Sequence, residues 1–213
     1  MRRDVRNDLR AAYDAKAEMR DEREIARWKL DLRAAVLERL RSERCTRLLE
    51  IGAGPGSDAA FFAGQRIDVV CVDLSSEMIR LCRAKGLEAY EMDANDLRFP
   101  DGSFDAAYSL NALLHLTHAE WPRVLREARR VLRDGGLFFL TVYGGFDHEG
   151  VWQDDRYEPK RFFSFQSDER LVATAKTAFE VVSFERMELE NDDPKLHVQS
   201  LILRAPQHAS ATR

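Results

Sequence analysis

The chain of 213 residues lacks any apolar run long enough to cross a membrane. Its first residues, Met1 to Asp4, also lack the apolar segment of a secretory signal. The three cysteines, Cys45, Cys71 and Cys82, have neither an even count nor metal-ligand spacing, which predicts free thiols and no metal site. We therefore expect a reduced, cytoplasmic protein without a membrane partner.

The chain also lacks a large excess of either positive or negative side chains. The chain has 33 Lys and Arg against 37 Asp and Glu, a formal net charge of -4, with both signs mixed throughout. No basic stripe matches a nucleic-acid backbone, so we expect no nucleic-acid partner. The length suits one domain with a substantial core, which we place at residues 45–206, followed by a polar tail at 207–213.

Three alternating glycines follow directly on a predicted strand. The apolar run that begins at Leu48 ends in Gly52, Gly54 and Gly56, and a helix is expected from Ser57. Glycine allows positive φ and lets a ligand lie against bare backbone, while the helix N-terminus offers free N–H groups. The pattern predicts a loop that binds a small ligand.

The spacing of this loop argues against a dinucleotide. The dinucleotide fingerprint requires a third glycine where this chain has Ser57, and Pro55 stiffens the turn before it. Glu50 would repel a diphosphate, whereas it would suit an ammonium or sulfonium group. A cationic ligand therefore fits better than a nicotinamide dinucleotide.

Three segments in order carry a family resemblance. Residues 50–56 (EIGAGPG) resemble the first motif of the class I S-adenosylmethionine-dependent methyltransferases. Residues 70–75 (VCVDLS) resemble the second strand of that family, and residues 91–105 resemble its run from the third strand into the fourth. The resemblance implies S-adenosyl-L-methionine as cofactor and S-adenosyl-L-homocysteine as product.

The resemblance also implies roles for single residues. Asp73 would bind both ribose hydroxyls, Asp93 the adenine amino group, and the Ala94 N–H would face the ring. Asn111 would bring backbone carbonyls towards the sulfonium or amino group, and Tyr13 would cap the methionine end, unless it is an ordinary packing aromatic. The implied cofactor contacts are completed by Glu50, Gly52, Ala53, Gly54, Gly56, Leu74 and Met78.

The alternation of predicted strands and helices, together with the resemblance, implies an α/β fold, doubly wound, with a mostly parallel seven-stranded sheet, a C-terminal antiparallel hairpin and an N-terminal helical arm. Later strands are expected at 68–72, 88–92, 104–110, 137–143, 179–189 and 196–204, the last two joined by a turn at 191–194. Helices are expected at 58–64, after Ser75 or Ser76, after a capping box at 117–120 or from Pro122, and at 168–178.

Residues 1–44 are expected to form one or two helices with a single apolar stripe, serving as an arm or lid over the cofactor cleft. Residues 144–165 show no clear period and are rich in aromatic side chains. This segment is a candidate substrate lid, or else an irregular patch covering the sheet edge. Its pair Asp154 and Asp155 is interpreted as solvated loop charge.

The chemistry of methyl transfer needs no nucleophilic side chain, because holding the reactants in line is sufficient. If the acceptor must lose a proton, His115 is the candidate base, with His118 or His148 as substitutes; each is otherwise a structural histidine. We expect a small acceptor, apolar or aromatic like the segment at 144–165. The alternatives are a cofactor-binding module without catalysis, or a protein or RNA methyltransferase. The Asn/Asp-Pro-Pro-aromatic tetrapeptide of nucleobase and glutamine methyltransferases is absent.

Overall fold

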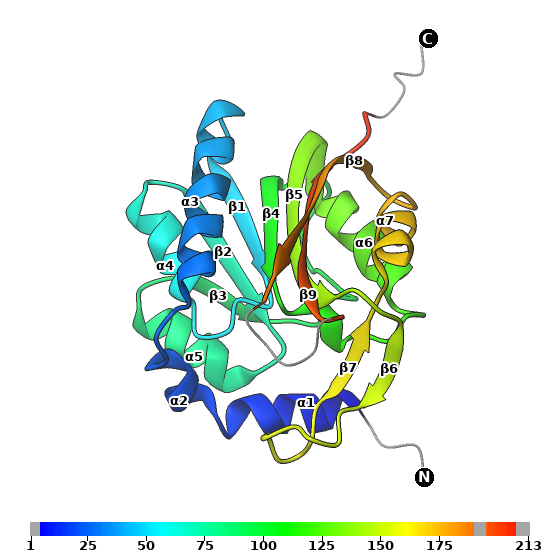
Figure 1. Ribbon diagram of the computed structural model, residues 1–213. Coiled ribbons are helices and arrows are strands. Elements are labelled where there is room, and N and C mark those ends of the chain that lie inside the picture. The colour runs from blue at the N-terminus through cyan, green and yellow to red at the C-terminus, as the bar shows by residue number, and fades with distance from the viewer. Residues whose placement is uncertain (1–4, 190–194, 208–213) are drawn as a thin grey trace.

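The computed structural model describes residues 5–189 and 195–207 and contains one seven-stranded sheet with helices on both faces (Figure 1). The strand order is β3-β2-β1-β4-β5-β9-β8. Its strands are β1 (Arg47–Ile51), β2 (Asp68–Asp73), β3 (Glu88–Glu91), β4 (Phe104–Leu110), β5 (Leu132–Gly144), β8 (Glu180–Glu188) and β9 (His197–Arg204). The predicted turn at 191–194 and the tail from residue 208 lie outside the described residues.

The five strands from β3 to β5 are parallel, and β9 runs antiparallel to both β5 and β8. This arrangement confirms the predicted sheet and its C-terminal hairpin. The central strands are continuous apolar runs because both faces are covered: Leu48 and Leu49 in β1 and Val70 in β2 are fully buried. The order in which successive strands are added to the sheet reverses between β1 and β4, which is where doubly wound sheets bind ligands.

Two helical layers enclose the sheet (Figure 1). On one face lie α3 (Arg27–Ser42), α4 (Ser57–Gly64) and α5 (Ser76–Ala84), and on the other lie α6 (Trp121–Val131) and α7 (Asp168–Ala175). Ser75 caps α5, because its Oγ accepts from the Met78 N–H at 3.1 Å. Helix α6 begins at Trp121, directly after the predicted capping-box segment and one residue before the alternative start at Pro122, which lies in its first turn. Within the described ranges, no helix has the length and apolar character that crossing a membrane requires.

The N-terminal arm contains three helices, whereas one or two were predicted. Helix α1 (Val5–Asp14) crosses below the carboxyl ends of the strands, and the short α2 (Ala17–Asp21) leads to α3 (Figure 1). The break after α1 has a physical cause. Asp14 Oδ1 accepts from the Ser75 hydroxyl at 2.5 Å and from the Glu77 N–H at 3.3 Å, which fixes the end of α1 against the N-terminus of α5.

The expectation of an irregular segment at 144–165 is wrong. Strands β6 (His148–Val151) and β7 (Phe162–Phe165) form an antiparallel pair outside the main sheet. Each strand has four residues, which is too short for a period of two to stand out in the sequence. Phe165 holds the pair together, since its ring contacts the rings of His148, Trp152 and Phe163 at centroid distances of 6.0, 5.7 and 5.6 Å.

Candidate functional site

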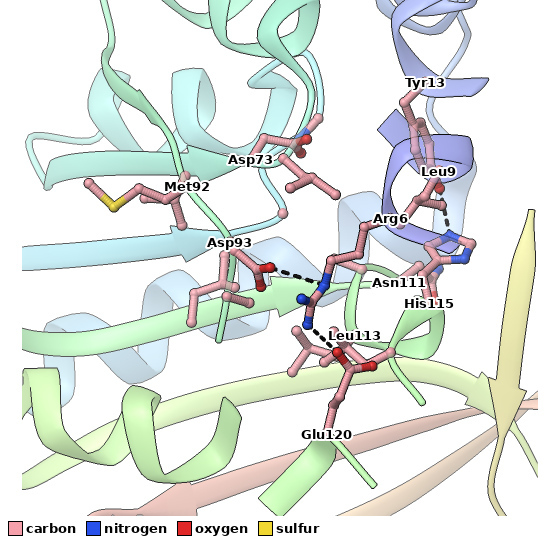
Figure 2. Close-up of a pocket in the computed structure, with 18 of the residues that line it drawn as sticks. Arg6, Leu9, Tyr13, Asp73, Met92, Asp93, Asn111, Leu113, His115 and Glu120 are labelled. Atoms are coloured by element: carbon pink, nitrogen blue, oxygen red, sulfur yellow. Dashed lines mark hydrogen bonds and ion pairs between the residues drawn. The ribbon is translucent and has the colours of Figure 1, made fainter. Parts of the chain in front are cut away.

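A cavity of about 570 Å³ lies at the carboxyl ends of β1, β2 and β4, with α1 forming its opposite wall (Figure 2). This volume is within the range of sites that hold a nucleotide-sized ligand. Ile51, Val72 and Met92 supply part of its apolar lining, and Asp73 and Asp93 lie at the ends of strands that face it. We call it the first cavity.

The glycine loop approaches both the sheet and the cavity with bare backbone. Gly52 and Gly54 have φ of +73° and +55°. A Cβ on Gly52 would lie 2.1 Å from the Ala112 Cβ, whereas a Cβ on Gly54 would meet no atom within 4 Å. Gly52 is therefore required by internal packing, and Gly54 presents open backbone to the cavity.

Asp73 is held by backbone donors on both sides. Its Oδ2 accepts from the Gly54 N–H and its Oδ1 from the Ser75 N–H, each at 2.9 Å. Burial raises the pKa of Asp73, although these backbone donors oppose the shift. Each carboxylate oxygen has a second lone pair, so the side chain keeps room for two hydroxyl donors.

Arg6 of α1 spans the far end of the first cavity (Figure 2). Its Nε lies 3.1 Å from Asp93 Oδ2, and its guanidinium also contacts Glu120. Asp93 Oδ1 accepts from both the backbone and the side-chain N–H of Asn95, at 2.8 and 3.1 Å. Arg6 therefore occupies an oxygen of the carboxylate that the resemblance assigns to the adenine amino group.

Tyr13 and His115 meet at the boundary of the cavity, with Tyr13 Oη 2.6 Å from His115 Nε2 (Figure 2). His115 Nδ1 lies 2.7 Å from the Phe162 carbonyl oxygen, which can only accept, so Nδ1 carries the proton. Burial lowers the pKa of His115 to about 3, which keeps the ring neutral. Nε2 therefore accepts, and the Tyr13 hydroxyl donates to it.

A second cavity of about 390 Å³ lies on the other side of the glycine loop and shares Gly52, Gly54, Tyr13 and His115 with the first. Glu50 lines it and is 4% exposed, and its Oε2 has no hydrogen-bond partner among the described residues. Burial raises the pKa of Glu50, and the nearby Asp58 adds to the shift. Such an orphaned acceptor is suited to a cationic donor.

Cationic side chains border this second cavity: Arg20, Arg23, Lys29 and Arg161. Arg161 forms a bidentate pair with Asp155, with distances of 2.8 and 2.9 Å, and its guanidinium stacks 3.7 Å from the Tyr157 ring centroid. The Asp155 side chain is only 5% exposed. The prediction that Asp155 is solvated loop charge is therefore wrong, because the residue neutralises an arginine at the cavity.

Most of the residues singled out in the sequence lie at one of the two cavities. Gly56 and Met78 line neither. Gly56 instead faces Cys82, whose Sγ would lie 2.9 Å from an added Cβ, and Met78 is fully buried beneath Tyr13. The cavity residues taken from the sequence are Tyr13, Glu50, Gly52, Ala53, Gly54, Asp73, Leu74, Asp93, Ala94, Asn111 and His115.

Sequence reasoning missed the cations that the arm contributes: Arg6, Arg20, Arg23 and Lys29. They occur in a segment where almost every second residue is charged, and no spacing distinguishes them from solvated neighbours. Only the path of three helices around the sheet brings them to the cavities.

Comparison with known proteins gives one family match, to the methyltransferase domain, over residues 49–140. A fatty-acid O-methyltransferase from Mycolicibacterium smegmatis is 39% identical over 101 residues, covering 45% of this chain and 36% of the relative. A malonyl-[acyl-carrier protein] O-methyltransferase from Geobacter sulfurreducens is 32% identical over 163 residues, covering 68% and 60%. The chain thus spans less than two thirds of the length of either relative.

Among solved structures, the chain resembles a 1,6-didemethyltoxoflavin N1-methyltransferase from Burkholderia thailandensis, crystallised with its substrate and S-adenosylhomocysteine. The TM-score is 0.72 with 20% identity, over 94% of this chain and 88% of the other. At this identity the likeness establishes the shared fold.

Proposed function

The chain belongs to the class I S-adenosylmethionine-dependent methyltransferase family, and on that premise we propose that it is an enzyme that methylates a small acceptor with an apolar or aromatic body. The observation that carries this proposal is the meeting of the two cavities at the glycine loop. The first cavity is suited to the nucleoside, and the second, which contains Glu50, is suited to the acceptor and to the ammonium end of the cofactor. The relative named as a fatty-acid O-methyltransferase supports an apolar acceptor body.

The residues of the first cavity fit the cofactor. We assign the ribose hydroxyls to the free lone pairs of Asp73, the adenine to the apolar walls near Met92 and Leu74, and the adenine amino group to Asp93. The open backbone at Gly54 leaves room for the methionine portion. The orphaned Oε2 of Glu50 accepts from its ammonium group, which suits a buried carboxylate without a partner.

When bound, S-adenosylmethionine supplies a methyl group on a sulfonium, and the electron pair of the broken C–S bond returns to sulfur. The protein holds the acceptor in line and excludes water with Tyr13 and the β6–β7 pair. Where the acceptor carries a proton, Tyr13 Oη can take it only as the Tyr13 proton passes to His115 Nε2, and the burial that lowers the pKa of His115 to about 3 opposes this transfer. An acceptor that is already deprotonated needs neither residue as a base.

The proposal is tested by isothermal titration with S-adenosylhomocysteine, run beside NAD, followed by an assay of methyl transfer from labelled S-adenosylmethionine. We expect binding of S-adenosylhomocysteine and none of NAD. Binding of NAD alone, or of neither ligand, would contradict the proposal.

The Asp73→Ala variant localises the ribose. Loss of two hydrogen bonds to a charged group should weaken S-adenosylhomocysteine binding by about 2 kcal/mol, roughly 30-fold. The matched control is Asp68→Ala, at the other end of the same strand, where the carboxylate is 59% exposed and lines neither cavity. Equal affinities of the two variants would show that the ribose binds elsewhere.

A further inference from the structure

The second cavity has a surplus of positive charge. Four cationic side chains line it, and the acids beside them are Glu24, Glu50 and Asp58. Asp58 is already engaged, since it lies 3.4 Å from Arg33 and accepts from the Tyr108 hydroxyl at 3.3 Å. Glu50 is buried in surroundings that favour its neutral form. These two acids therefore offer little compensation, which leaves the exposed Glu24 as a single acid beside four cations.

Three of the four cations have no carboxylate partner. Arg161 is neutralised by Asp155, but Arg20, Arg23 and Lys29 form no ion pair with any described residue. Arg20 donates to the Tyr157 hydroxyl at 3.2 Å, and its Nε is buried without a hydrogen-bond partner. A buried donor without a partner is costly unless a ligand supplies the acceptor.

Lys29 is the cation of this group that most needs an anionic partner, because its surroundings on balance disfavour its charge. It is half-buried, and its ammonium lies 5.4 Å from the Trp28 ring centroid, a cation–π contact that favours the charge but supplies no hydrogen-bond acceptor. Burial lowers the pKa of Lys29, and the neighbouring charges of Arg20 and Arg23 lower it further. Asp58 opposes these effects but is held by Arg33. An anion placed beside Lys29 would relieve this like-charge repulsion.

The remaining walls of the cavity are apolar or aromatic and include Leu110, Leu114, Tyr143 and Phe163. The lining therefore divides into two parts. The cationic part comes from the arm and from Arg161, and the apolar part comes from the carboxyl ends of β4 and β5, the segment after β4, and β7. A ligand that satisfies both parts has a negative group on an apolar body.

Resting on the proposed function, we propose that the methyl acceptor is a small organic acid, whose carboxylate binds at Lys29 and Arg23 and whose body packs against Phe163 and Tyr143. Arg20 lines both cavities, so it is also within reach of the methionine carboxylate of the cofactor. Lys29 and Arg23 line only the second cavity. Glu50, which we assign to the ammonium group of the cofactor, also lines only this cavity, so variants at Lys29 must be read on acceptor and cofactor binding together.

The test uses pairs of probes that match in shape and differ in charge: benzoate with benzamide, and octanoate with octanamide. Each is titrated into the full chain saturated with S-adenosylhomocysteine. We expect at least one acid to bind tenfold or more tightly than its amide, because a charge-assisted contact exceeds a neutral one. A panel in which no acid exceeds its amide overturns the proposal.

Variants then locate the preference. Lys29→Gln should reduce the acid-to-amide ratio about tenfold while leaving S-adenosylhomocysteine affinity unchanged. The control is Arg27→Gln on the same helix, where the arginine is 86% exposed and paired with Asp31, and it should change neither quantity. Loss of S-adenosylhomocysteine affinity in Lys29→Gln with an unchanged ratio assigns the cation to the cofactor and overturns the proposal. Failure of the unmodified chain to bind S-adenosylhomocysteine instead contradicts the proposed function.

Discussion

The two walls of the candidate site are built in different ways. The strand-end wall consists of the loops that follow β1, β2 and β4 at the carboxyl ends of these strands. It presents backbone groups and short acidic side chains such as Asp73. The arm wall consists of long side chains from α1, α2 and α3, including Arg6, Arg20 and Lys29. The first wall is fixed by strand geometry over a few residues. The second depends on where a helical segment packs against the rest of the chain.

This difference decides how each wall responds to substitution. Backbone that approaches closely does not tolerate an added atom, whereas a long side chain can be shortened at a smaller cost. The following variants probe that contrast in order of decreasing expected effect.

Gly52→Ala should have the largest effect. The new Cβ would lie 2.1 Å from the Ala112 Cβ, at a φ of +73° that L-residues avoid. Strain and overpacking together predict a loss of about 3 kcal/mol in the free energy of unfolding. The control is Gly54→Ala, which also has positive φ but open space at its Cβ, and it should lose about 1 kcal/mol. Denaturant unfolding measures both, and equal losses would remove the packing role of Gly52.

His115 should give the next largest effect, through pH. Its pKa is about 3 in the folded protein and near 6.5 in the unfolded chain, so the unfolded state binds the additional proton between these values. Stability from this group is complete above pH 6.5 and is lost on acidification, by about 2 kcal/mol between pH 7 and pH 5. The measurement is the difference in unfolding free energy between the unmodified chain and His115→Asn, which retains a donor for the Phe162 carbonyl. A difference that is constant with pH would contradict the neutral, buried ring.

Tyr13→Phe should cost less. The variant removes the hydrogen bond that the hydroxyl donates to His115 Nε2 at 2.6 Å and the one that it accepts from Arg161 Nη1 at 3.2 Å, and it keeps the ring that packs on Met78. We expect a loss of about 1 kcal/mol in unfolding free energy. If Tyr13 moves a proton, turnover of an acceptor that must be deprotonated falls much further than stability does. Parallel losses of turnover and stability would leave Tyr13 with a structural role alone.

Arg6→Gln should have the smallest effect on stability, below about 1 kcal/mol, because the Arg6 side chain is 46% exposed and its ion pairs are screened by solvent. The same substitution frees Asp93 Oδ2, so S-adenosylhomocysteine affinity should stay equal or rise. Calorimetry at two salt concentrations measures this. A large loss of affinity would show that Arg6 itself contacts the ligand.

The strand-end wall was predictable from sequence because strand geometry over a few residues fixes it. Its information is local: an apolar strand, three glycines and an acid at each strand end. The helices α4 and α5 were also expected close to their observed bounds because Ser57 and Ser75 mark their starts. Local chemistry at these positions agrees with the final fold.

The arm wall was not predictable. Residues 1–51 contain neither glycine nor proline, so nothing in the sequence marks the breaks that divide the arm into three helices. The contact between Tyr13 and His115 joins positions 102 residues apart, and the pair of Asp155 with Arg161 depends on a hairpin of two short strands. Such contacts follow from tertiary packing, which periodicity does not report.

The way in which α1 is attached has a consequence for ionic strength. Ala12 is the only fully buried residue in α1. Ion pairs attach the helix to the rest of the chain: Arg6 contacts Asp93 and Glu120, and Arg10 contacts Glu91. Exposed ion pairs weaken as salt is added, whereas apolar burial does not. Salt should therefore loosen the cover of the first cavity before it affects the sheet. Exchange of S-adenosylhomocysteine should accordingly become faster with rising salt while the unfolding midpoint stays nearly constant.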